Sequence, residues 1–214
     1  MQTQTNYYSH KLINTTMTGN PFVITCMDCS SWTQTFDVTA STNDRQLPAV
    51  ALKSIGFDML IDTSTSKLPN SFTVFYVGLT KGGHAFFGGS VETGTMVPNQ
   101  THSHTGSDLN VMLNKDLFNI KKVMRFSLGA QTFATDLANR PHVTNLDDSK
   151  KRIYYTEKFN TTIKDTVSGW TACSDPHQPW ALRRYWIIFK NNVEANVTDA
   201  EMKISYQQMA TVCY

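Results

Sequence analysis

The chain has 214 residues, of which 40% are hydrophobic and 11% aromatic, so it can bury a sizeable core and is not expected to be disordered. Charged residues make up only 17%, below the ~25% of an average soluble protein, and the formal net charge is +2. This balance, without an Arg-rich arm, argues against a strong autonomous nucleic-acid binder.

The beginning of the chain, MQTQTNYYSHKL, has no basic stretch followed by an apolar one, so we expect no signal peptide. No window reaches the ~18 apolar residues of a membrane-spanning helix. Without a secretion signal, the four cysteines are expected to be reduced. The four glycosylation sequons are then chance matches, at Asn14, Asn99, Asn160 and Asn196.

The first half of the chain predicts extended segments separated by turns. Residues 1–20 are expected to form an extended N-terminal arm, and a turn follows at Gly19-Asn20-Pro21. Residues 50–62 alternate between polar and apolar, as a half-buried strand does. Its apolar face consists of Ile55, Phe57, Met59 and Ile61.

Residues 72–79 read FTVFYVGL, and such a continuous apolar run predicts a strand buried on both faces. Residues 80–106 are rich in glycine and predict a long surface excursion, with a short strand at 85–87. Ser107 and Asp108 are suited to capping a short helix over residues 109–114.

The second half predicts four further strands. Residues 118–128 alternate, with Phe118, Ile120, Met124, Phe126 and Leu128 expected to face inward. Residues 150–164 predict a long strand with Ile153, Tyr155, Phe159 and Ile163 on one face. Residues 202–214 predict the last strand, with Met202, Ile204, Tyr206, Ala210 and Val212 on one face.

The strand predicted within residues 180–192 (WALRRYWIIFKNN) is the most apolar in the chain. Its uninterrupted run from Tyr185 to Phe189 indicates burial on both faces. Arg183 and Arg184 stand at its start, and successive side chains of a strand point to opposite faces. We therefore expect at least one of these arginines to point away from the core.

Seven or eight strands, almost no helix and long irregular connections predict an all-β fold. Long connections disfavour a simple meander and favour a single jelly roll, in which consecutive strands often lie in different sheets. We expect residues 1–214 to form one such domain.

Three segments of the C-terminal half resemble capsid proteins of small circular single-stranded DNA viruses, above all those of the geminivirus type. Residues 114–126 resemble that family's short helix and the basic strand after it, and residues 151–155 (KRIYY) resemble a basic, aromatic strand. Residues 171–187 resemble the last-but-one strand and its preceding loop. The resemblance covers roughly residues 108–192, about half the chain.

The resemblance implies a jelly-roll coat protein located in the virion and, during assembly, in the host cell nucleus. Its partners would be copies of itself, in a small icosahedral shell of the T=1 kind, and a single-stranded nucleic acid, DNA in this family. Members of the family usually begin with a long basic arm, which the first residues here do not resemble. Either that arm lies outside this sequence, or the folded surface takes its role.

The cations of the basic strands are the candidate nucleic-acid contacts. If the strands pair as the resemblance implies, several cations share one rim or face and could neutralise phosphates without reading sequence. The alternative is that they are solvated or paired with carboxylates of neighbouring subunits. Tyr154, Tyr155, Trp180 or Trp186 could stack on bases, although Trp186 fits the core better. The candidate set is Lys121, Lys122, Arg125, Lys150, Lys151, Arg152, Arg183 and Arg184.

Two weak metal-binding patterns also occur. Cys26 and Cys29 have the spacing of zinc ligands, and Cys173 with His177 could complete a tetrahedral site. Buried free thiols are the more common outcome for cysteine. His102 and His104, followed by Asp108, are faintly similar to the metal-binding turn of cupins, which are also jelly rolls.

No Ser-His-Asp set or pair of catalytic carboxylates stands out, so we expect no enzyme, no cofactor and no metal. The sequence therefore predicts a structural coat protein whose copies assemble laterally. The alternative is a cupin-like metal-dependent enzyme or a carbohydrate-binding jelly roll.

Overall fold

The computed structural model describes residues 4–17, 22–28, 49–64, 69–88, 91–103, 110–129, 133–135, 141–143, 149–164, 184–192 and 200–213. The elements are β1 (Gln4–Met17), β2 (Phe22–Asp28), β3 (Ala49–Asp62), β4 (Asn70–Leu79), α1 (Lys81–Phe87), η2 (Thr93–Thr95), β5 (Phe118–Leu128), β6 (Phe133–Thr135), β7 (Pro141–Val143), β8 (Lys150–Lys164), β9 (Arg184–Asn192) and β10 (Ala200–Cys213). No helix in these ranges is long and apolar enough to cross a membrane.

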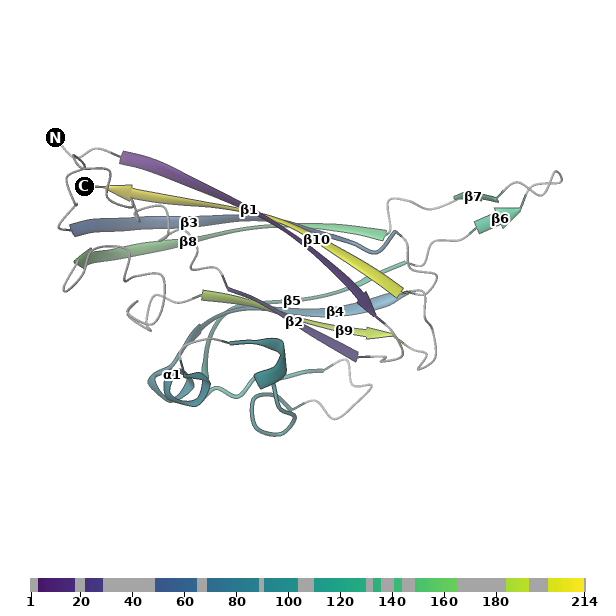
Figure 1. Cartoon of the computed structure of the whole chain (residues 1–214), viewed down its shortest axis with the longest axis horizontal. Coiled ribbons are helices and arrows are strands. Elements are labelled where there is room, and N and C mark those ends of the chain that lie inside the picture. Colours follow the sequence, from purple (N-terminus) through teal and green to yellow (C-terminus); the bar gives the residue numbers. More distant parts are fainter. Residues whose placement is uncertain are drawn as a thin grey trace, which may run out of the picture.

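Eight of the described strands form two four-stranded antiparallel sheets, in the orders β1-β10-β3-β8 and β2-β9-β4-β5. Of these eight, only β4 and β5 are both consecutive in the sandwich and paired with each other. Connections that keep switching between two sheets are typical of the jelly roll, so this strand order confirms the predicted fold. Figure 1 shows the two sheets as stacked layers, with α1 beneath β2-β9-β4-β5.

The segment expected to be an N-terminal arm contributes β1, which pairs with β10 along its whole length, from Gln4 opposite Cys213 to Met17 opposite Ala200. It is therefore an integral strand of its sheet. The remaining described strands, β6 and β7, pair with each other and lie beyond one end of the sandwich in Figure 1.

The sheet β2-β9-β4-β5 has a buried cluster on each face, because β4 and β9 are apolar on both. In β9, Trp186 and Ile188 enter the core between the sheets, whereas Tyr185, Ile187 and Phe189 enter a second cluster on the far side. Phe87 of α1 and residues of the 91–113 segment complete that second cluster. The predicted two-sided burial of β4 and β9 is confirmed.

Strand β5 departs from the simple alternation that was predicted. A β-bulge shifts its register with β4, so that Tyr76 pairs with Lys122 but Val77 pairs with Ile120. The extra residue, Lys121, reverses the two faces of the strand. Consequently Met124, Phe126 and Leu128 contact the core between the sheets, while Phe118 and Ile120 belong to the second cluster.

Helix α1 replaces the predicted strand at 85–87. The hydroxyl of Thr80 caps the helix by accepting a hydrogen bond of 3.0 Å from the Gly83 amide. Gly88, with φ of 59°, ends it in the left-handed conformation that glycine adopts easily. The helix predicted over 109–114 is wrong for its described residues, because Leu113 forms a β-bridge with His102.

Substituting Gly83 with alanine tests the packing of α1. A Cβ at this buried position would overlap the backbone carbonyl of Leu117, so α1 would have to move away from the sheet. We expect Gly83→Ala to lower the free energy of unfolding by about 1–3 kcal/mol. Gly94→Ala is the control, because its Cβ would meet nothing within 4 Å. Equal urea midpoints for the two variants would contradict this packing.

Lys190 makes the stability of the fold depend on pH. It is fully buried on β9, opposite Phe72, and burial lowers its pKa from 10.5 to about 8. Between those values the unfolded chain binds more protons than the folded one, so stability rises with pH. Between pH 8 and pH 10.5, the free energy of unfolding of the wild type should rise by up to about 3 kcal/mol relative to that of Lys190→Met. Urea unfolding of both proteins across this pH range measures the rise. A difference in the free energy of unfolding that stays constant with pH would refute the lowered pKa of Lys190.

Candidate nucleic-acid interface

The two basic strands lie at the same edge of the sandwich. Strands β5 and β8 are each the last strand of their sheet, and the Lys151 amine lies 5.8 Å from the centre of the Phe126 ring across that edge. Four exposed cations lie on these two edge strands, and we call this set the edge patch: Lys121, Lys122, Arg125 and Lys151. The cations of β5 extend over four residue steps, at most roughly 14 Å at a rise of ~3.4 Å per residue.

The bulge contributes to the edge patch by placing Lys121 and Lys122 consecutively at an exposed position. Lysines and bulges are also what proteins use to prevent an edge strand from pairing with another chain. The edge patch therefore has a structural explanation that does not need a nucleic acid.

Lys150 and Arg152 lie on a different surface, the outer face of the sheet β1-β10-β3-β8. Lys150 pairs with Asp62 at 3.7 Å, and Arg152 donates two hydrogen bonds to Asp58. These bonds lower the pKa of Asp58 and raise that of Arg152. Both cations thus face solvent beside a carboxylate that offsets part of their charge.

Arg184 is not on the surface, contrary to the sequence prediction. It is 5% exposed, and its guanidinium donates hydrogen bonds of 2.7 and 2.9 Å to the two carboxylate oxygens of Glu157. The Tyr76 hydroxyl donates a third bond, of 2.8 Å, to the same carboxylate, and the guanidinium lies over the ring of Phe159. This buried pair joins β8 of one sheet to β9 of the other, so its charge serves the fold. Arg183 lies outside the described residues.

The aromatic side chains that were candidates for stacking on bases are also partly buried and partly exposed. Trp186 is fully buried, and the Tyr155 ring packs edge-on against Tyr76 and Trp186. Burial, followed by the charge of Glu157, raises the pKa of Tyr155, and Arg184 opposes the shift. Tyr154 is 66% exposed, whereas Trp180 lies outside the described residues.

The metal-binding patterns are described only in part. Burial raises the pKa of Cys26 to about 12, which keeps it a thiol, while Cys29, Cys173 and His177 lie outside the described residues. Among the residues that are described, no three potential metal ligands cluster.

The His102 ring lies 5.1 Å from the ring of Phe189, and its Nδ1 is 2.9 Å from the hydroxyl of Thr101. His102 is therefore held within the second cluster. The other two residues of the cupin-like pattern, His104 and Asp108, fall outside the described ranges.

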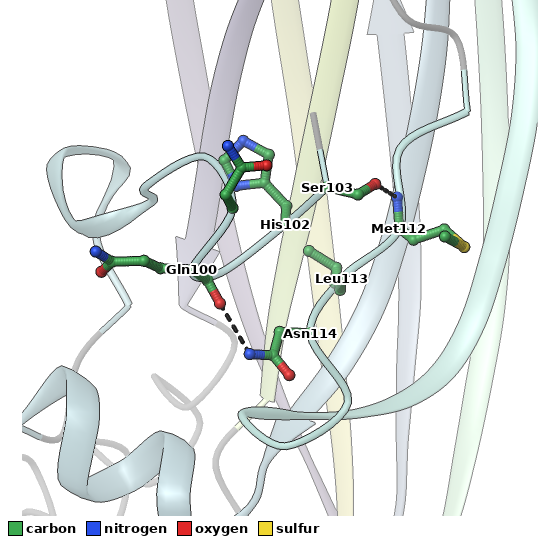
Figure 2. A pocket seen from close by; sticks show the side chains of 7 residues that line it. Gln100, His102, Ser103, Met112, Leu113 and Asn114 are labelled. Atoms are coloured by element: carbon green, nitrogen blue, oxygen red, sulfur yellow. Dashed lines mark hydrogen bonds between the residues drawn. The ribbon is translucent and has the colours of Figure 1, made fainter. Parts of the chain in front are cut away.

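A pocket of about 330 Å³ lies between two segments of the layer that covers β2-β9-β4-β5 (Figure 2). Its residues are Asn99, Gln100, His102, Ser103, Met112, Leu113 and Asn114. Hydrogen bonds tie the segments together, from the Asn114 amide to the Gln100 carbonyl and from the Met112 backbone N–H to the Ser103 hydroxyl. Because its lining includes no Asp, Glu, Lys or Arg, this pocket does not suit phosphate.

No protein-family model matches the chain, and no curated protein matches it significantly. Solved structures do match it over its whole length. A structure of Desmodium yellow mottle tymovirus is 11% identical, covers 100% of this chain and 88% of that one, and has a TM-score of 0.46. A 60-mer of BFDV capsid protein is 11% identical, covers 100% of this chain and 93% of that one, and has a TM-score of 0.37. With TM-scores this low, the fold assignment rests on the strand order itself.

Breaking the buried ion pair should destabilise the sandwich strongly. Either Arg184→Met or Glu157→Leu leaves a buried charge without its partner, which typically costs about 3–5 kcal/mol. The double variant should lose less free energy of unfolding than the two single variants lose in sum, because neither charge is left buried without its partner.

Urea unfolding of the four proteins measures these changes. Arg152→Met is the control, because it removes a cation from the exposed pair with Asp58 and should hardly move the midpoint. If Arg184→Met were no more damaging than Arg152→Met, the cross-sheet role of Arg184 would be refuted.

Proposed function

We propose that this chain is a coat protein whose copies assemble into a closed shell around a single-stranded nucleic acid. The shell would be a small icosahedral one of the T=1 kind, the chain would act as a single domain, and its role would be structural rather than enzymatic. By resemblance, the cargo would be DNA, and the protein would reside in the virion and assemble in the host cell nucleus.

The observation that carries this proposal is that the outer faces of the two sheets differ: one is covered by further elements and the other is exposed. The sheet β2-β9-β4-β5 is thickened on its outer side by α1 and by residues 91–103 and 110–113, which bury the second cluster. The other sheet presents exposed polar and basic side chains on β8, including Lys150, Arg152 and Lys158. A shell subunit needs two such dissimilar surfaces, because one side meets the cargo and the other meets solvent.

The phosphate contacts would be individually weak and non-specific. The candidate cations that are exposed among the described residues are the edge patch with Lys150 and Arg152, whereas Arg184 is engaged by Glu157. Arg183 lies outside the described residues and stays a candidate. Asp58 and Asp62 offset part of the charge of Arg152 and Lys150. Many copies in one shell would nevertheless hold a nucleic acid firmly, because linked weak sites bind with high avidity.

Two measurements test this function. Purified protein should form uniform shells in light scattering and electron microscopy, and protein that stays monomeric at every salt concentration would refute the proposal. Lys121→Ala/Lys122→Ala should lower the nucleic acid packaged per shell, read from the ratio of absorbance at 260 and 280 nm.

The matched control is Lys81→Ala/Lys115→Ala, which removes two exposed lysines from the layer over the sheet β2-β9-β4-β5, the sheet to which Lys121 and Lys122 also belong. It should leave packaging unchanged. In Lys121→Ala/Lys122→Ala, the slope of the logarithm of the binding constant against the logarithm of the salt concentration should become shallower by about 0.7 for each single-strand phosphate contact that is lost. Equal packaging by both double variants would remove the edge patch from the interface.

A further inference from the structure

Tyr154 is the most exposed large hydrophobic side chain among the residues that the structure describes, with 66% of its surface accessible. It lies on β8, on the outer face of the sheet β1-β10-β3-β8. The neighbouring Tyr155 points the opposite way, into the core between the sheets. A ring that serves packing alone gains nothing from this exposure, since its contribution to stability comes from removing apolar surface from water.

The ring of Tyr154 is held by a short chain of contacts. The Arg152 guanidinium lies 4.8 Å from the centre of the ring, within the range of a cation–π interaction. Arg152 is in turn fixed by its two hydrogen bonds to Asp58 on the adjacent strand, a two-point geometry that restricts its rotation. One face of the ring therefore rests on a fixed partner, and much of the ring remains accessible to a ligand.

The surroundings of Tyr154 favour an anionic ligand. On β3, β8 and β10, the described charged side chains of this outer face include four cations and two carboxylates, and Lys53 of β3 is also exposed at the bulge between Leu52 and Ser54. The cations are Lys150, Arg152, Lys158 and Lys203, and the carboxylates are Asp58 and Asp62. An exposed aromatic ring within a positive field combines the two elements by which proteins hold single strands, a stacking platform and a groove or face that attracts the backbone.

We propose that Tyr154 is a base-stacking platform for single-stranded nucleic acid, with Arg152 and Asp58 as its positioning residues. This inference rests on the proposed coat function and names the site of contact with the cargo. The ligand is single-stranded because the bases of a duplex are already stacked on each other and cannot reach a ring that lies on a sheet. The role of Arg152 is to position the Tyr154 ring and not to bind phosphate, because Asp58 already offsets its charge.

Fluorescence anisotropy with three labelled probes tests the site. The probes are a 20-nucleotide oligothymidylate, a phosphate–sugar chain of the same length without bases, and a 20-base-pair duplex. Tyr154→Ala should weaken binding of the oligothymidylate about 5- to 100-fold, the range found when a stacking aromatic is removed. It should change binding of the other two probes by less than about twofold, because they contribute phosphates without an accessible base.

Two further variants separate stacking from damage to the fold. Tyr154→Phe keeps the ring and should bind the oligothymidylate like the wild type. Phe86→Ala removes an aromatic side chain that is 47% exposed on α1, and it should bind all three probes unchanged. Losses of equal size on the oligothymidylate and the base-free chain, or no loss at all with Tyr154→Ala, would overturn the stacking site.

Shell formation is scored separately by light scattering, so that the two proposals can fail independently. If the protein forms shells but Tyr154→Ala binds the oligothymidylate as tightly as the wild type, the stacking site is overturned and the coat function stands. A Tyr154-dependent preference in a protein that never forms shells would uphold the stacking site and overturn the coat function.

Discussion

The fold depends on the need to cover β4 and β9 on both faces. Both strands are buried along most of their described length, and their central runs, Phe72–Leu79 and Tyr185–Phe189, are apolar except for Thr73. The sheet that contains them therefore cannot leave either face in water. The second sheet covers one face, and α1 with residues 91–103 and 110–113 covers the other. Since the second sheet has only one apolar face, its outer side is free to carry polar and charged groups, and the molecule acquires two unlike surfaces.

The ion pair between Glu157 and Arg184 determines which cations remain for function. It joins the two sheets where β8 and β9 approach each other, and it takes into the core one of the charges that the sequence assigns to the surface. The remaining basic residues then fall into two groups with different surroundings. The edge patch has a second explanation, as protection against pairing between edges, whereas the outer face holds an exposed ring that no packing requirement explains.

Local pattern predicts what depends on one strand and misses what depends on its partners. Residues 118–128 and 150–164 could be delimited because apolar residues recur on one face along most of each segment. The reversal of faces in β5 arises from its register with β4. Lys122 and Val123 interrupt the alternation at that point, but the sequence alone does not show how β5 pairs with its partner strand. Helix α1 was missed because its glycines suggest a loop, although Gly83 is needed where the Leu117 backbone approaches. The burial of Arg184 depends on an acid 27 residues earlier on another sheet.

Under the proposed function, the outer face of β1-β10-β3-β8 would meet the cargo and the covered sheet would face away from it. Electron cryomicroscopy of nucleic-acid-filled particles tests this orientation most directly. The account predicts cargo density against that face around Tyr154, with α1 toward the particle exterior. Particles in which α1 lines the interior and Tyr154 lies on the outside would contradict this orientation.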